Sequence, residues 1–271
     1  MSISREQPRL TAAAQDVART VAGVAHERGA VASILTGSFA RGDAHPESDL
    51  DLHFIGDGPD YELSRVDGLL VSQSWSLAAA HRAGFRDPGR AGAAVPAWRG
   101  ALILLDPDNF ARELQQEATR WTWDVIGDDT LNAWVAGQIT GYAEEIHKLV
   151  VAIERGRTTT AGIQRSILAL RLGVVMSVNC RLLYDSENRL WDMVGEALGG
   201  AWASAQARAL GSRGESFDET CAAALELYGH AVDASPARFS VTQHDVIQHA
   251  RDIADAAAAR LLASGRRSHG R

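Results

Sequence analysis

Strand-like and helix-like patterns are unevenly distributed along this chain, and that division limits its fold class more than any other feature. Short apolar runs bounded by turn residues occur before Pro107 and are typical of buried strands. From about residue 109 to residue 263, alanine, leucine and valine recur at helical spacing. We therefore predict an α+β fold, with a small mixed sheet first and an all-helical bundle after it.

The same pattern predicts individual elements and domains. A helix is expected over residues 11–28, and strands over 31–37, 50–55, 68–77 and 101–106. A short helix (78–83) and a loop rich in glycine and proline (84–99) separate the last two strands. Interruptions of the helical half are expected at Gly156, 185–188, 211–214 and 235–236. The expected domains are 1–118 and 119–265, with the boundary between 107 and 127, and a disordered tail at 266–271.

Composition limits the partners and the location. The formal net charge of -7 argues against a nucleic-acid partner, because such proteins usually carry a basic face, and it suits a cationic small-molecule substrate. No stretch approaches the run of about 18 apolar residues that a membrane helix needs, and the N-terminal segment lacks a signal-peptide pattern. We expect a cytoplasmic protein with no membrane partner. Cys180 and Cys221 form no metal-binding pattern and are expected in the core.

The segment from Leu35 to Phe54 carries the first residues with recognisable chemistry. A predicted buried strand ends at Gly37, where the absent side chain would let the backbone approach a ligand closely. Ser38 follows near the expected start of a short helix, where free N–H groups and the helix dipole favour phosphate. The pattern predicts a phosphate-binding turn.

Two aspartates lie in the next predicted strand. Asp49 and Asp51 are two residues apart, so their carboxylates should point to one face. Adjacent carboxylates repel unless a cation lies between them, and hard oxygen ligands suit Mg2+, which also binds phosphate oxygens. Either motif alone is common in ordinary turns and strand ends, but together they favour metal-assisted phosphoryl transfer.

Gly37-Ser38, ten intervening residues and then Asp49-Leu50-Asp51-Leu52 resemble the signature of the DNA polymerase β-like nucleotidyltransferase superfamily. By length, the small antibiotic-modifying members are most similar. The resemblance implies a nucleotidyltransferase sheet domain before a helical domain, and transfer of a nucleoside monophosphate from ATP or GTP to a hydroxyl, releasing pyrophosphate. It also implies that Gly37 and Ser38 contact the nucleotide and that Asp49 and Asp51 hold Mg2+. Arg41 is a further candidate for a phosphate contact, although an exposed arginine is the commoner case.

A second likeness lies in the helical half. Residues 142–160 resemble a helix of kanamycin-type aminoglycoside nucleotidyltransferases that carries a general-base glutamate and a phosphate-binding lysine, spaced Glu-x-x-x-Lys. Glu144 and Lys148 match this spacing, and Lys148 is the only lysine among 27 basic residues. An ordinary solvated ion pair on one helix face is the alternative, and Glu145 is the neighbouring candidate base, about 100° around the helix. The resemblance also implies a homodimer.

One residue of the superfamily pattern is missing. A third acid usually comes from the following strand, where this sequence has Ser72. Three interpretations are open: two carboxylates suffice with phosphate and water ligands, Asp67 is recruited, or the chemistry is weakened. Ser72 and Ser74 should share a face and line the pocket.

Several other polar and aromatic residues are weaker candidates. His45, His53 and His147 could serve a site, and for His53 a hydrogen-bonded structural role is at least as good an interpretation. Trp121 and Trp123, near the expected domain boundary, are expected to pack between domains rather than to stack on a base or sugar.

The leading hypothesis is a Mg2+-dependent nucleotidyltransferase acting on a small hydroxylated molecule of the aminoglycoside type. A non-catalytic nucleotide-binding or regulatory protein on the same fold is the alternative, and the missing third acid motivates it. Transfer to a protein or to tRNA is a third possibility, and the acidic charge argues against tRNA.

Overall fold

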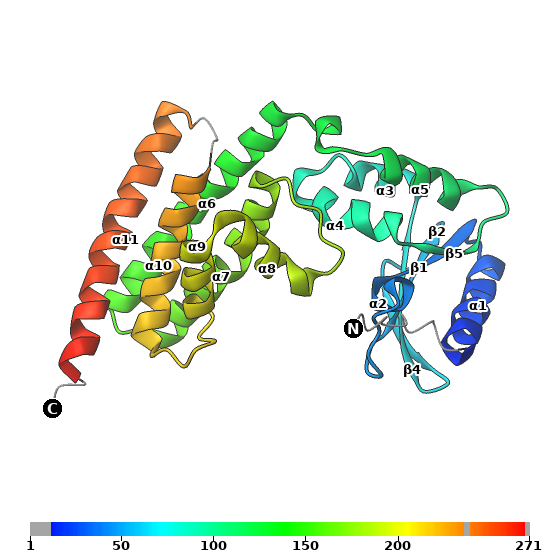
Figure 1. The fold of residues 1–271 in the computed structure, drawn as a ribbon, viewed down its shortest axis with the longest axis horizontal. Helices are drawn as coiled ribbons and strands as arrows, with labels where there is room; N and C mark the ends of the chain where they lie inside the picture. Colours follow the sequence, from blue (N-terminus) through cyan, green and yellow to red (C-terminus); the bar gives the residue numbers. More distant parts are fainter. Residues whose placement is uncertain (1–11, 236–238, 269–271) are drawn as a thin grey trace, which may run out of the picture. The chain divides into compact units, whose positions relative to one another are not determined.

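The computed structural model describes residues 12–235 and 239–268, and the chain divides into two compact units, Met1–Val125 and Ile126–Arg271 (Figure 1). The first unit contains α1 (Ala12–Glu27), β1 (Ala32–Thr36), α2 (Gly37–Arg41), β2 (Leu50–Ile55), β3 (Glu62–Val66), β4 (Leu69–Ser76), α3 (Ala78–Gly84), α4 (Pro88–Arg99), β5 (Leu102–Leu105), α5 (Phe110–Arg120) and the 3-10 helix η1 (Trp123–Val125). The second contains α6 (Asp128–Glu154), α7 (Thr158–Asn179), α8 (Glu187–Leu198), α9 (Gly200–Ala209), α10 (Phe217–Ala234) and α11 (Val241–Ser268).

The predicted α+β class is confirmed, because the described strands all lie in the first unit and the second unit is helical. The division follows Val125, after α5 has ended, whereas residue 118 lies inside that continuous helix. α11 continues to Ser268, so residues 266–268 are helical and not the expected disordered tail. Residues 269–271 lie outside the described part of the chain.

The five strands form one mixed sheet in the order β3-β4-β2-β1-β5. The central strand, β2, pairs antiparallel with β1 and parallel with β4. Because partnered residues share a face of the sheet, Thr36, Asp51 and Ser72 lie side by side on one face. The register of β2 therefore decides which side chains meet at the candidate site.

The helix α1 covers the other face of the sheet and contacts β1, β2 and β5 (Figure 1). Its buried residues Ala14 and Val17 recur at helical spacing and form one apolar cluster with Leu52 and Phe54 of β2. The ring of Phe54 lies 5.0 Å from the ring of Trp75 in β4. This cluster is the core of the first unit.

On the face of the sheet that carries Asp51, helices cover the end near Ile55 and Ser76, away from Asp51. His81 of α3 reaches the sheet there, with its Nε2 2.8 Å from Ser76 Oγ. α3, α4 and α5 pack against one another, and α5 also contacts β1. Both sides of β2 are consequently buried at Ile55, whereas the side chain of Asp51 is partly exposed.

Residues 84–99 do not form the expected loop. Most of them belong to α4, because Asp87 caps its start by accepting a hydrogen bond from the Gly89 N–H at 2.8 Å. Pro88 occupies the first turn, where a missing N–H costs nothing. The cap, together with the burial of Val95 and Trp98, offsets the low helix propensity of the glycines and prolines.

The strand β3 has no counterpart in the expected elements. Its residues alternate between partly buried and exposed, so they form no apolar run. Asp67 and Gly68 both have positive φ and join β3 to β4. An Asp-Gly pair is typical of a two-residue hairpin turn, and this is the signal that reveals the strand.

The helices of the second unit end near each expected interruption, and Gly199 separates α8 from α9 in addition; residue 236 lies outside the described residues. Tyr228 of α10 is buried and donates a hydrogen bond to the Ile139 carbonyl of α6 at 3.2 Å. Cys221 is buried as expected, whereas Cys180 at the end of α7 is only partly buried.

One described helix, α7, is long and apolar enough to cross a membrane by length and composition, and half of its apolar window is buried in the structure. It packs against α6, α9 and α10. These contacts are those of a core helix of the second unit.

The cap on α4 is directly testable. We expect Asp87→Ala to lower the free energy of unfolding by about 1 kcal/mol, because the Gly89 N–H loses its acceptor. Asp87→Ser retains a hydrogen-bond acceptor, so it should lower the free energy of unfolding by only a few tenths of a kcal/mol. Urea denaturation followed by circular dichroism measures both, and equal losses for the two variants would contradict the capping role.

Candidate functional site

Gly37 stands where β1 ends and α2 begins. Its φ of 68° lies in the left-handed region that favours glycine. A β-carbon at this position would collide with Asp51 Oδ2. The sequence predicts that the backbone at Gly37 approaches a ligand closely. In the structure, the space left by the missing side chain is taken by the Asp51 carboxylate.

The short helix expected at Ser38 is present as α2. The carbonyl of Ser38 accepts hydrogen bonds from the N–H groups of Gly42 and Asp43, at 2.9 and 3.0 Å, and Gly42 ends the helix with a φ of 80°. The first N–H groups of a helix have no acceptor one turn earlier. α2 thus turns such groups towards the end of the sheet where Asp51 stands.

Three charged side chains interact at this end of the sheet. Asp49 directly precedes β2, and Asp51 lies within it. Burial, and then the negative charge of Asp49, raise the pKa of Asp51 from 3.8 to about 6, while the positive charge of Arg41 partly offsets them. Arg41 also pairs with Asp43 at 3.3 Å. The carboxylates of this site thus carry more negative charge than the Arg41 guanidinium can neutralise.

The two aspartates fit a hard divalent cation in part. Carboxylate oxygens suit Mg2+, and a cation would relieve the repulsion that raises the pKa of Asp51. Ser72, which stands where the sequence pattern would have a third acid, is paired with Asp51 in the strand register. Asp67, the other candidate for a third ligand, lies in the turn between β3 and β4. Among the described residues, no group of three or more histidine, cysteine, aspartate or glutamate side chains gathers at one point. A cation held by Asp49 and Asp51 would take its other ligands from substrate and water.

A chain of hydrogen bonds continues along the same face of the sheet. His53 Nδ1 lies 2.5 Å from Ser74 Oγ, and His81 Nε2 lies 2.8 Å from Ser76 Oγ. The indole N–H of Trp98 donates to His81 Nδ1 at 3.3 Å, so His81 carries its proton on Nε2 and donates it to Ser76. Burial lowers the pKa of His53 and lowers that of His81 to about 4. Both rings are neutral, hydrogen-bonded parts of the fold.

Glu144 and Lys148 lie on α6, in the second unit, and are joined to each other at 2.8 Å. Lys148 also contacts Glu145 at 3.2 Å; Glu145 is 19% exposed, whereas Glu144 is 72% exposed. The hydrogen bond from Lys148, followed by its charge, lowers the pKa of Glu144. Glu144 is thus an exposed carboxylate paired with Lys148, and the lowered pKa makes it a weaker proton acceptor than an unpaired glutamate.

The remaining candidates have local structural partners. The Nδ1 of His45 accepts from the Glu47 N–H at 3.2 Å in the loop before β2. The ring of His147 lies 5.1 Å from that of His249 in α11. Trp121 is buried within the first unit, where its indole N–H donates to the Phe85 carbonyl at 2.8 Å. This bond holds the Trp121 indole beside the end of α3, and its expected packing between domains stays a prediction.

The packing of Gly37 against Asp51 is testable by a double-mutant cycle. We expect Gly37→Ala to lower the free energy of unfolding by about 2 to 4 kcal/mol, from backbone strain and overpacking together. In an Asp51→Ala background the collision is gone, and the same change should cost about 1 to 2 kcal/mol. Chemical denaturation measures all four proteins, and equal costs in the two backgrounds would contradict the contact.

The neutral state of His81 is testable by the pH dependence of stability. Its pKa is 6.5 unfolded and about 4 folded, so between these values the unfolded state binds more protons. The contribution of His81 therefore reduces the free energy of unfolding as pH falls from 6.5 to 4, by about 2 to 3 kcal/mol in total. His81→Gln should flatten this slope in urea denaturation, and an unchanged slope would contradict the assignment.

A match to one protein-family model agrees with this geometry. Residues 20–126 match the family model described as the nucleotidyltransferase domain. No curated protein matches the chain. Among solved structures, a nucleotidyltransferase-like protein from Exiguobacterium sibiricum 255-15 is similar, with 13% identity and a TM-score of 0.49, covering 81% of this chain and 74% of that chain. The matched segment contains the whole sheet, Gly37, Ser38 and both aspartates. Residues 20–126 are thus similar in sequence to a nucleotidyltransferase domain.

Proposed function

We propose that this protein is a Mg2+-dependent nucleotidyltransferase that moves a nucleoside monophosphate from ATP or GTP to a hydroxyl of an aminoglycoside-like molecule. The nucleotidyltransferase domain supports nucleoside monophosphate transfer in general. The observation that carries the proposal is the raised pKa of Asp51 beside Asp49, next to the turn at Gly37 and Ser38. A partly buried pair of like charges destabilises the isolated protein and suits a cationic ligand.

The roles proposed for these residues follow from their chemistry. Asp49 and Asp51 would hold Mg2+, which supplies charge neutralisation at the phosphates when it is bound. Ser38, the N–H groups of α2 and the Arg41 guanidinium would orient the triphosphate. The acceptor oxygen then forms a bond to the α-phosphorus while the bond to the departing pyrophosphate breaks.

Glu144 and Lys148 are proposed to serve the acceptor and the phosphates from α6. The ionised carboxylate of Glu144 would take the proton of the attacking hydroxyl. Lys148 holds that carboxylate in place at 2.8 Å, and its ammonium would offset the charge that develops on the pyrophosphate. A homodimer and a cationic acceptor belong to the same proposal, and the net charge of -7 is consistent with attraction of a polyamine.

A non-catalytic nucleotide-binding protein is the second candidate. The observation that favours it is Ser72, which stands beside Asp51 where the superfamily usually has an acid. Binding of a nucleotide needs the turn and the cation, whereas turnover also needs the geometry that a third ligand would impose.

Incubation with ATP or GTP, Mg2+ and an aminoglycoside panel tests the proposal. We expect pyrophosphate release and an acceptor heavier by one nucleoside monophosphate. Asp49→Asn and Asp51→Asn should reduce both signals to background, and Glu144→Gln should slow turnover by about a hundredfold or more. Glu154→Gln is the matched control, because Glu154 ends the same helix and pairs with Arg260 at 3.0 Å.

Two results would decide against catalysis as proposed. Unchanged transfer by Asp49→Asn and Asp51→Asn would remove the metal assignment. Tight nucleotide binding in calorimetry, without pyrophosphate release on any acceptor, would favour the binding protein instead.

A further inference from the structure

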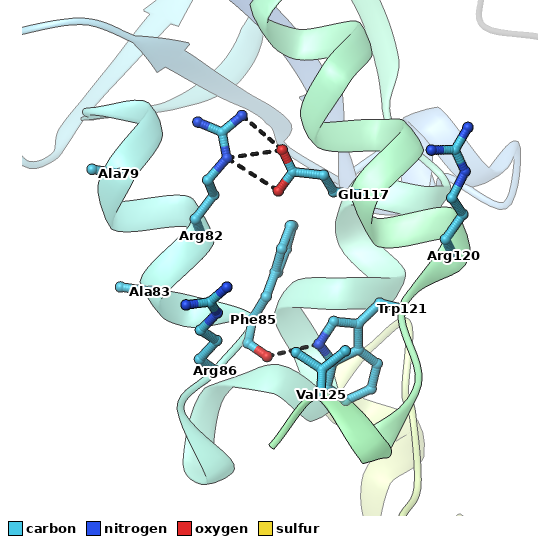
Figure 2. Close-up of a pocket in the computed structure, with 9 residues that line it drawn as sticks. All are labelled: Ala79, Arg82, Ala83, Phe85, Arg86, Glu117, Arg120, Trp121 and Val125. Atoms are coloured by element: carbon cyan, nitrogen blue, oxygen red, sulfur yellow. Dashed lines mark hydrogen bonds and ion pairs between the residues drawn. The ribbon is translucent and has the colours of Figure 1, made fainter. Parts of the chain in front are cut away.

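The first unit has a pocket built from residues that take no part in the aspartate site. It has a volume of about 790 Å3 and lies between α3 and α5, with Phe85 and Trp121 among its lining residues (Figure 2). We call it the α3–α5 pocket. Sites for small organic ligands typically occupy about 300 to 1,000 Å3, so the pocket has room for one.

The interior surface of the α3–α5 pocket is largely apolar. Phe85 and Trp121 are each 4% exposed, and the single indole N–H is already bonded to the Phe85 carbonyl. The ring of Trp121 therefore offers only carbon surface to a ligand. Ala79 and Ala83 stand one turn apart on α3, where their small side chains leave space, and Val125 adds an apolar edge. Such a lining suits an aromatic or aliphatic body.

The charges around the pocket are unbalanced. Arg82 is neutralised by Glu117, with an N–O distance of 2.7 Å (Figure 2). Glu113 lies 3.7 Å from the same guanidinium group. Arg86 and Arg120 also line the pocket, and in the described part of the chain their side chains have no ion pair or hydrogen bond. Two guanidinium groups are thus left without counter-charge beside an apolar surface, in a protein of net charge -7.

We propose that the α3–α5 pocket binds a small organic anion with an aromatic or aliphatic body. The Arg86 guanidinium would bind the anionic group, since guanidinium forms bidentate bonds with oxyanions, and Phe85 and Trp121 would contact the apolar body. Arg120 lies on the opposite side of the pocket (Figure 2) and would add electrostatic attraction at longer range. The site differs in residues and in ligand charge from the aspartate site, so it stands whether or not nucleotidyl transfer occurs.

A matched pair of fluorescent probes tests the proposal on the full chain. 8-Anilinonaphthalene-1-sulfonate is an aromatic anion, and N-phenyl-1-naphthylamine has nearly the same body without charge. We expect one sulfonate probe to bind per chain, more tightly than the neutral probe, with an affinity that falls as NaCl is added. Arg86→Gln and Arg120→Gln should each weaken the sulfonate about three- to tenfold and leave the neutral probe unchanged.

Three control variants separate the pocket from other surfaces. Arg112 lies on α5, as Arg120 does, but it is not among the residues that line the pocket, and it donates a hydrogen bond to Asn109 at 2.7 Å. Arg112→Gln should therefore not alter probe binding. Ala83→Trp fills the pocket and should weaken both probes. Asp51→Asn should leave the sulfonate affinity unchanged.

Sulfonate binding that survives the double change of Arg86 and Arg120, or that is equally weakened by Arg112→Gln, would overturn the proposal. Equal affinity for the two probes in wild-type protein, without salt dependence, would overturn it as well. This last comparison needs no variant, so it decides the question even if a substitution impairs folding.

Discussion

The position of β2 in the sheet is the constraint on which the rest of the first unit depends. This strand pairs antiparallel with β1 on one side and parallel with β4 on the other. A shift by one residue would turn Asp51 into the core beneath α1 and Leu52 out to the opposite face. Burial of Leu52 and Phe54 against α1 therefore holds the carboxylate in place, and the apolar core and the charged site are two sides of one strand.

The face of the sheet opposite α1 differs in character along its length. At one end, Asp49 and Asp51 concentrate negative charge that burial makes unfavourable. At the other end, His53 and His81 are neutral, and serine hydroxyls occupy their hydrogen bonds. Because these two histidines are neutral, they neither offset the negative charge of the aspartates nor attract an anionic ligand. The electrostatic demand for a cation is thus confined to the end of the sheet next to α2.

Much of this arrangement could be predicted from the sequence because its signals are local. β2 has the bounds that its apolar alternation predicts, and the Gly37-Ser38 turn begins a helix as expected. The position of α4 could not be predicted from propensity, since its start depends on the cap at Asp87. The environment of His81 could not be predicted either, because Trp98 and Ser76 reach it from different elements. The roles of Glu144 and Lys148 stay predictions, since they belong to the helical unit.

The contact between Gly37 and Asp51 has a consequence for how this gene can vary. Every missense change at a glycine codon introduces a β-carbon, and at this position any β-carbon meets the aspartate oxygen. No mild substitution exists there. Codon 37 should therefore stay fixed for as long as the carboxylate at position 51 is kept.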